Sequence, residues 1–242
     1  MNNKLCALVA ISLLGLAIAT PTIASDDGVL RARLGLSDNS FTTLYSGGDM
    51  EVDYTSLNMG VTWIRPDALY LDLAYKQDLG ASWNTRELTG FSDEDYSRAD
   101  ITLTVGKALD NGVQVFAGYQ NSQTDIALPA AWGMVSEEEF NISGFFLGAG
   151  RSFKVGEGSL NLNAALGYMD AELYDGGGVW HDSKKGSGHS LGASYTLFLS
   201  EGLAANIELK QQNYDYDFDD DAPLTSGDDK MTMIGINLVR QF

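Results

Sequence analysis

The stretch at 231–242 constrains what this chain can fold into more than any other part of the sequence. Its residues alternate between apolar side chains and small or polar ones, which is the period of a β-strand. Gly235, Asn237 and Gln241 lie on one face of such a strand. The opposite face is apolar and carries Ile234, Ile236, Leu238 and Phe242. A strand of this kind suits a wall between lipid on one side and a polar lumen on the other.

This terminal strand resembles the C-terminal signature strand of bacterial outer-membrane β-barrels, with Phe242 as the closing aromatic residue. It departs from that pattern at Arg240, where the family more often has an apolar residue. The resemblance is to small barrels of the porin-like or OmpA-like type, and no particular member is indicated. It implies a location in the outer membrane of a Gram-negative bacterium. It also implies that barrel-assembly machinery recognises 231–242 as its partner segment.

The N-terminal segment predicts export. Lys4 precedes an apolar run at 5–19, and small residues at 22 and 24 fit cleavage after Ala24. The run is short for a transmembrane helix, so a retained anchor is the weaker alternative. We therefore expect a cleaved signal peptide at 1–24 and a barrel at 25–242. The single cysteine, Cys6, lies in the signal, which leaves no disulfide or thiolate site in the mature chain.

Ten segments of alternating hydrophobicity predict an all-β chain folded as one antiparallel up-and-down transmembrane barrel. Ten strands fit best, with eight or twelve as alternatives. The sixth segment has an open register because Phe145, Phe146 and Leu147 are consecutive. The segments are 29–36, 57–64, 69–75, 99–105, 113–119, 141–153, 160–168, 191–199, 203–209 and 231–242.

The connections between these segments alternate in length, as they do in outer-membrane barrels with short periplasmic turns and long external loops. A water-soluble barrel such as a lipocalin lacks this rhythm and buries its apolar face inward. The short connections are 65–67, 109–112, 154–158 and 200–202, and the long ones are 37–55, 77–97, 121–140, 170–189 and 213–230.

Charge follows the same division. Of 33 acidic residues, 24 fall in the long connections, whereas only 4 of 15 basic residues do, so these connections carry 4 − 24 = −20. Such an acidic rim repels nucleic acid. It is suited to sharing divalent cations with outer-membrane lipids and lipopolysaccharide. The alternative is a solvated acidic surface with no partner.

Charged residues also fall on the faces expected to point into the lumen. Five bases and three acids form a nearly balanced set, and charges in a narrow lumen must be paired. Ten strands lie near the filled end of the barrel range, although a thin water path stays open as an alternative. The set comprises Arg31, Arg33, Asp72, Lys76, Arg98, Asp100, Glu208 and Lys210.

Catalysis has few candidates. The chain has two histidines, His181 and His189, and Ser183 follows the first in a His-x-Ser spacing that resembles lipid A deacylases. Those enzymes carry the pair on a strand wall, whereas His181 is expected in a polar loop, so a solvated histidine is favoured over a catalytic one. We see no extended omptin protease motif. Whether the chain is an enzyme stays open, with a non-catalytic protein favoured.

The acidic run at 215–221 has the first three ligand positions of a calcium loop in Asp215, Asp217 and Asp219. It lacks the glycine and glutamate that such a loop needs, so weak surface calcium binding is the most it predicts. Tyr214, Tyr216 and Phe218 are instead expected near the membrane interface. No cofactor is expected, and the oligomeric state is left open.

The sequence thus favours a non-catalytic outer-membrane barrel with acidic external loops and an envelope-structural or surface-interaction role. A narrow channel for cations or small neutral solutes is the alternative, and a lipid or peptide hydrolase is the third hypothesis.

Overall fold

The computed structural model describes residues 28–45, 48–83, 96–127, 137–174, 179–183, 185–218 and 226–242. The segment 1–24 lies outside them, so the signal peptide stays a prediction. None of the described residues forms a helix long and apolar enough to span a membrane. The strands found in the described residues are β1 (Val29–Tyr45), β2 (Gly48–Ile64), β3 (Leu69–Trp83), β4 (Tyr96–Ala108), β5 (Val113–Ala127), β6 (Glu137–Val155), β7 (Gly158–Tyr174), β8 (Trp180–Asp182), β9 (Lys185–Ser200), β10 (Leu203–Asp217) and β11 (Ser226–Gln241).

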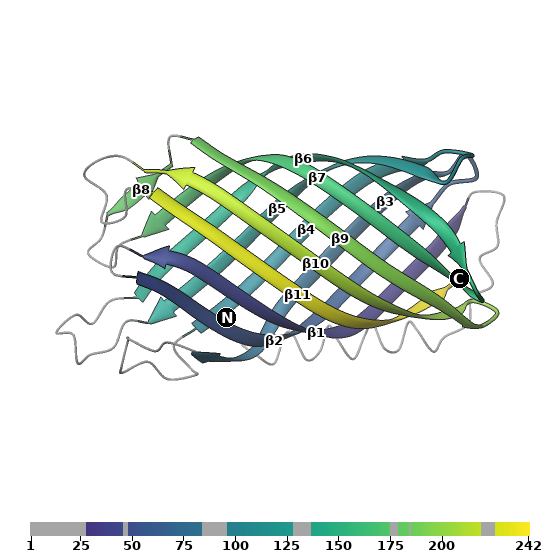
Figure 1. The fold of residues 1–242 in the computed structure, drawn as a ribbon, viewed down its shortest axis with the longest axis horizontal. Helices are drawn as coiled ribbons and strands as arrows, with labels where there is room; N and C mark the ends of the chain where they lie inside the picture. The colour runs from purple at the N-terminus through teal and green to yellow at the C-terminus, as the bar shows by residue number, and fades with distance from the viewer. Residues whose placement is uncertain are drawn as a thin grey trace.

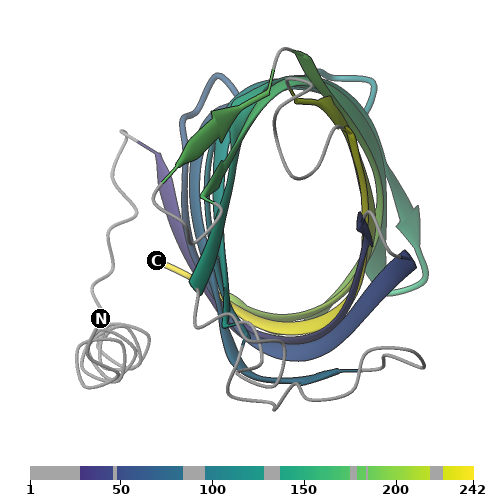
Figure 2. The same ribbon diagram turned by 90° about the vertical axis from the view of Figure 1, so that its left-hand side faces the viewer.

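Ten of these strands close into one antiparallel up-and-down barrel (Figures 1 and 2). Each wall strand pairs with the next along the chain, β7 pairs with β9, and β11 pairs with β1 to complete the ring. The short β8 pairs only with the outer end of β7. The predicted fold class and strand number are therefore confirmed.

The strands are strongly tilted, as Figure 1 shows. A path of directly paired residues that leaves β1 at Arg31 and crosses every wall strand returns to β1 at Thr43, which is 43 − 31 = 12 residues farther along. A stagger of 12 residues over ten strands corresponds to a tilt of about 42°, within the range of membrane barrels. The path runs through Arg31, Thr62, Asp72, Thr104, Gly118, Phe146, Gly167, Gly188, Tyr214, Asp229 and Thr43.

Tight turns join the strands at one end of the barrel, where the C-terminus also lies (Figure 1). Gly112 closes the β4–β5 turn by donating its N–H to the carbonyl of Leu109 at 3.0 Å, and its φ of +78° favours glycine. Ala68 has the same role in the β2–β3 turn with a φ of +62°. The backbone N–H of Phe242 donates to the carbonyl of Leu30 at 2.8 Å, which fixes the last residue to the first strand.

An apolar belt surrounds the half of the barrel nearest the tight turns. Every wall strand contributes at least one large, exposed apolar side chain to it, and soluble monomeric proteins rarely expose so large a continuous apolar surface. The belt includes Leu36, Trp63, Leu71, Leu73, Ile101, Leu103, Val105, Val115, Phe145, Leu147, Leu162, Leu166, Leu191, Leu197, Ile207, Leu209, Ile234, Ile236 and Leu238.

Beyond the belt the strands continue with the opposite polarity. In β10, Tyr214 and Tyr216 are buried in the lumen, whereas Asp215 and Asp217 are exposed outside. The predicted long connections were therefore wrong in extent. The connection predicted at 37–55 is largely strand, because β1 runs to Tyr45 and β2 begins at Gly48. The alternation continues through these segments, but its apolar face no longer faces lipid.

The open register of the sixth segment is resolved in β6. Phe145 and Leu147 are about 70 % exposed on the outer face, at 71 % and 70 %, whereas Phe146 points into the lumen and packs against a buried cluster there. The three consecutive apolar residues thus serve both faces of one strand.

The change of polarity along the outer surface is testable on β6. Leu147→Arg, in the belt, is expected to lower the free energy of unfolding by about 2–4 kcal/mol, because a cation faces the lipid interior. Asn141→Arg lies on the same face of the same strand beyond the belt, next to Glu139, and is the matched control with an expected change within about 0.5 kcal/mol. Urea unfolding of the protein refolded in lipid vesicles measures both, and equal effects would contradict the assignment.

Candidate functional site

The lumen has two parts that differ in packing. The part inside the apolar belt holds a cavity of about 660 Å³, which extends from Ala68 at the turn end to Gln120 and Tyr214. The part beyond the belt is filled by two clusters of buried side chains, which we call the outer plug. The outer plug comprises Phe140, Ile142, Met169, Ala171, Leu173, Tyr214, Tyr216 and Phe218 in one cluster, and Phe41, Val52, Tyr54, Ala81, Tyr96, Ile126 and Met231 in the other.

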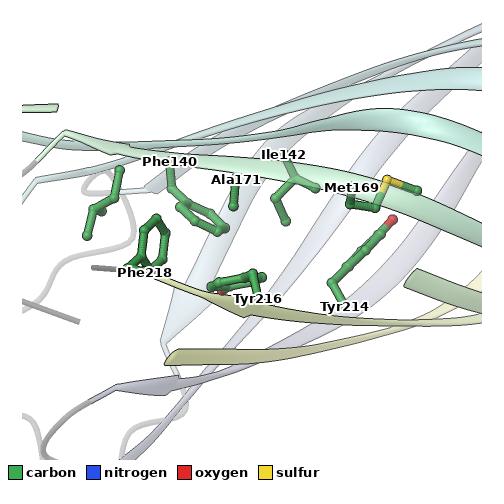
Figure 3. Close-up of a cluster of buried hydrophobic side chains, with 8 residues drawn as sticks. Phe140, Ile142, Met169, Ala171, Tyr214, Tyr216 and Phe218 are labelled. Atoms are coloured by element: carbon green, nitrogen blue, oxygen red, sulfur yellow. The ribbon is translucent and has the colours of Figure 1, made fainter. Parts of the chain in front are cut away.

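The first cluster of the outer plug joins β6 and β7 to β10, with side chains from both sides pointing toward one another (Figure 3). Tyr216 packs against Phe140 and Phe218 with ring centroids 5.3 and 5.5 Å apart. Gly188, on the intervening β9, leaves space for Tyr214, because a Cβ atom there would lie 3.0 Å from the ring of Tyr214 and 3.3 Å from Met169. Tyr214 therefore reaches across β9 toward the wall formed by β7.

The second cluster surrounds a buried cation. Arg98 is 1 % exposed, and its guanidinium lies 5.1 Å from the ring centroid of Phe41. Its Nη1 donates to Thr124 Oγ1 at 3.2 Å, and its backbone N–H donates to Asp78 Oδ1 at 2.8 Å. Arg98 is thus part of the packing of the outer plug and does not line the cavity.

A hydrogen-bonded bridge crosses the lumen where the cavity meets the outer plug. The amide nitrogens of Gln120 and Gln212 each donate to the hydroxyl of Tyr214, at 2.8 and 2.7 Å, and Gln212 also donates to Gln120 Oε1 at 3.2 Å. Gln120 lies on β5 and the other two lie on β10, which is four strands away around the ring in one direction and six in the other. The bridge therefore connects opposite walls of the barrel.

Below this bridge, Arg33 and Asp72 form a bidentate ion pair across β1, β2 and β3. Arg33 Nη1 and Nη2 donate to the two carboxylate oxygens of Asp72 at 2.9 and 2.8 Å, and Thr62 also donates to Asp72. Gly60 leaves the space for the guanidinium, since a Cβ atom there would lie 2.5 Å from Arg33 Nε. Paired in this geometry, both charges are well satisfied in the lumen.

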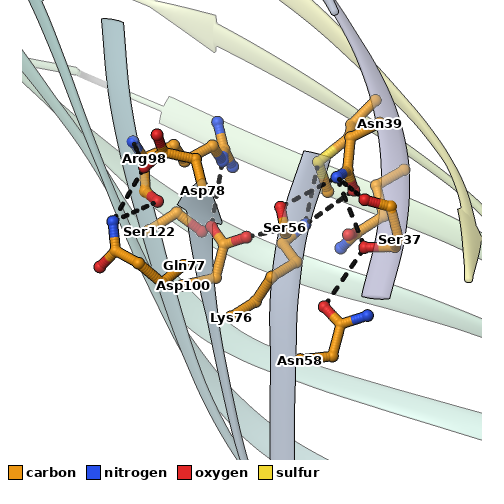
Figure 4. A network of polar contacts seen from close by, with 12 residues as sticks. Ser37, Asn39, Ser56, Asn58, Lys76, Gln77, Asp78, Arg98, Asp100 and Ser122 are labelled. Atoms are coloured by element: carbon orange, nitrogen blue, oxygen red, sulfur yellow. Dashed lines mark hydrogen bonds and ion pairs between the residues drawn. The ribbon is translucent and has the colours of Figure 1, made fainter. Parts of the chain in front are cut away.

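Lys76, Asp100 and Arg98 form a second charged group, shown in Figure 4. Asp100 accepts from Lys76 Nζ at 2.9 Å and from Arg98 Nε at 3.1 Å. Lys76 Nζ also lies 3.4 Å from Asn39 Oδ1, and Asn39 in turn donates to Ser56 Oγ at 2.9 Å. One carboxylate thus joins a cation of the outer plug to a cation of the cavity.

The remaining charges of the predicted set are placed differently. Arg31 lies near the turn end, where its Nε donates to Gln241 at 3.1 Å. Glu208 and Lys210 also line the cavity, yet in the part of the chain that the structure describes neither has an ion-pair or hydrogen-bond partner. The structure therefore brings seven of the eight residues to one cavity and pairs only some of them.

The candidate catalytic residues are not brought together. His181 pairs with Leu173 on β7 and His189 pairs with Leu166, seven residues away, or about 23 Å along the strand. Ser183 Oγ accepts a backbone hydrogen bond from Ala171 at 2.8 Å, and His189 lies on the outer face with its Nε2 2.7 Å from Asn213 Nδ2.

The acidic run on β10 likewise forms no compact site. Asp215 and Asp217 point outward from an extended strand, and Asp219 lies outside the described residues. No group of three or more potential metal ligands occurs among the residues the structure describes. Tyr214 and Phe218, predicted near the membrane interface, are instead buried in the outer plug. That expectation was wrong because the apolar face of β10 turns inward beyond the belt.

Sequence reasoning did not identify the bridge of Gln120, Gln212 and Tyr214, nor the buried Asp229. The two glutamines are uncharged and far apart in sequence, so only the closed ring reveals their contact. Asp229 is 0 % exposed, although it was assigned to a long connection, and it lies beside Thr43 and Tyr216. The signal available for it was its place in the inward-facing alternation of 227–237.

A closed antiparallel barrel with an apolar outer belt and a polar lumen has the fold of outer-membrane β-barrels. Among solved structures, the Escherichia coli outer-membrane protease OmpT is similar, with a TM-score of 0.58, 12 % identity, and coverage of 93 % of this chain and 99 % of that one. An outer-membrane channel from Pseudomonas putida F1 is similar with a TM-score of 0.51, 10 % identity, and coverage of 93 % and 100 %.

No protein-family model matches the sequence, and no curated protein matches it. The two structural neighbours, a protease and a channel, share the architecture at low identity, so their likeness defines the fold and leaves the function to the chain's own residues.

Asp100→Asn tests the importance of the shared carboxylate. The substitution leaves the buried cations Lys76 and Arg98 without this counter-charge, so the free energy of unfolding is expected to fall by about 3–5 kcal/mol. Asp67→Asn removes the partner of Arg65 in an exposed ion pair of 3.4 Å at a turn, and a loss of no more than about 1 kcal/mol is expected. Urea titration in vesicles compares them, and similar losses would rule out a special role for Asp100.

Proposed function

We propose that this chain is a non-catalytic integral outer-membrane barrel with a lumen closed to solutes and an envelope-structural or surface-interaction role. The observation that supports this most directly is the outer plug together with the bridge of Gln120, Gln212 and Tyr214. Side chains from opposite walls meet there, and several of them are less than 2 % exposed. A barrel section packed to this degree has the interior of a soluble protein rather than of a pore.

The surface beyond the apolar belt supports a role in contacts. Its outward side chains are mostly polar and the charged ones are mainly acidic, for example Asp125 and Glu139, which both accept from Gln123 at 3.2 Å. Acidic side chains at this level are placed to share divalent cations with lipopolysaccharide phosphates. We further propose that the last strand, ending at Phe242, is the segment that barrel-assembly machinery recognises.

The cavity supports a second candidate function, that of a channel. It reaches the turn end of the barrel, and a rearrangement of the outer plug would extend it into a narrow path for cations or small neutral solutes. The hydrolase hypothesis has no comparable support, because the two histidines and Ser183 do not share a site.

Planar-bilayer recording separates the closed barrel from the channel. The refolded protein is expected to give no discrete openings. Replacing Phe41, Tyr214 and Tyr216 by alanine removes three rings from the outer plug and is expected to produce small discrete openings. Discrete openings of the unaltered protein would overturn the proposal.

The matched control replaces large side chains on the outer face. The triple variant Phe145→Ala, Leu147→Ala and Tyr168→Ala removes a similar volume from exposed positions and is expected to stay silent. Anomalous gel mobility of unboiled samples establishes that each variant has folded before it is recorded.

A further inference from the structure

The cavity beneath the outer plug has the dimensions of a small-molecule site. At about 660 Å³ it falls within the range of 300–1,000 Å³ that is usual for ligand pockets. The outer plug closes one end, and the other end reaches the tight turns near Ala68. A solute on the turn side of the membrane would therefore enter a pocket with one closed end.

Two opposite charges on one wall of this pocket are left without partners. Glu208 and Lys210 lie on the inner face of β10, two residues apart, so their Cα atoms are separated by about 6.6 Å. Arg33 and Lys76 have their own carboxylates in Asp72 and Asp100. Glu208 and Lys210 are charged neighbours of each other but form no ion pair within 4 Å.

The charges around this pair select against simple ions. Lys210 has Lys76, Asp100 and Arg33 as further charged neighbours, so cations outnumber carboxylates around it and an incoming simple cation is repelled there. An incoming simple anion that reaches Lys210 is repelled by Glu208. A solute that carries both an ammonium and a carboxylate satisfies both groups, because each of its charges makes one charge-assisted hydrogen bond of about 2.8 Å.

The rest of the pocket supplies apolar surface. Phe116 and Phe146 both line it, with ring centroids 6.3 Å apart in an edge-to-face arrangement. Ala165, on β7, also lines it with a small side chain. An aromatic side chain of a bound solute would find ring contacts on the side away from the charges.

We propose that this cavity is a binding site for a free α-amino acid with an aromatic side chain. Lys210 holds the carboxylate, Glu208 holds the ammonium group, and Phe116 and Phe146 contact the ring. The proposal does not depend on whether the outer plug opens, so it can fail while the closed barrel stands, and the reverse also holds.

Isothermal titration calorimetry on the protein refolded in lipid nanodiscs tests it, with L-phenylalanine as the probe. A saturable heat with one site per chain is expected. The analogues 3-phenylpropionate, which lacks the ammonium, and phenethylamine, which lacks the carboxylate, are expected to bind at least about tenfold more weakly. Absence of saturable heat, or equal affinity for all three compounds, overturns the proposal.

Three variants assign the contacts. Lys210→Met is expected to weaken L-phenylalanine binding about tenfold while leaving phenethylamine unchanged. Glu208→Gln is expected to weaken L-phenylalanine similarly while leaving 3-phenylpropionate unchanged. Lys107→Met, at an exposed position on the outer face of β4, is the matched control and should bind as the unaltered protein does. Gel mobility of unboiled samples verifies folding, and uniform weakening toward all three compounds in either variant would contradict the assigned contacts.

Discussion

Hydrogen bonding between β11 and β1 is the interaction on which the rest of the structure depends. Lipid offers no partner to a free strand edge, so a sheet whose outer face is apolar must close on itself. The pairing of 229–241 with 31–43 achieves this, and the contact between Phe242 and Leu30 completes it. Closure fixes the stagger of the strands, and the stagger decides which inward side chains share a level. Gln120 reaches Gln212 across the lumen as a consequence of that closure.

The sequence predicts the strands well inside the apolar belt and poorly beyond it. Inside the belt, residues such as Ile234 and Leu238 face lipid, so alternation with an apolar outer face identified the strands. Beyond it the outer face meets water, and the apolar residues of the same strands turn inward. Tyr216 and Asp217 show that reversal within one dipeptide of β10. Alternation alone does not show which face of a strand is outside. The outer ends of the strands were therefore predicted as loops.

The lumen charges were also predictable only in part. That Arg33, Asp72, Lys76 and Asp100 face inward follows from the alternation alone. Their pairing depends on the register between neighbouring strands, and the sequence does not indicate that Glu208 and Lys210 stay apart. The bridge of Gln120, Gln212 and Tyr214 could not be predicted from the sequence, since its members lie on opposite walls of the closed ring. The composition predicts nearly balanced charges in the lumen, and the arrangement of the strands decides which of these charges form ion pairs.

The make-up of the outer plug has a consequence for how the molecule forms. Its second cluster joins Phe41 of the first strand and Met231 of the last to Tyr96 and Ile126 from the middle of the chain. Phe41 and Met231 are directly paired across the seam between β1 and β11, so this cluster is complete only when both ends of the chain have met. Its packing then opposes reopening of that seam. The outer plug thus stabilises the closed ring that it fills.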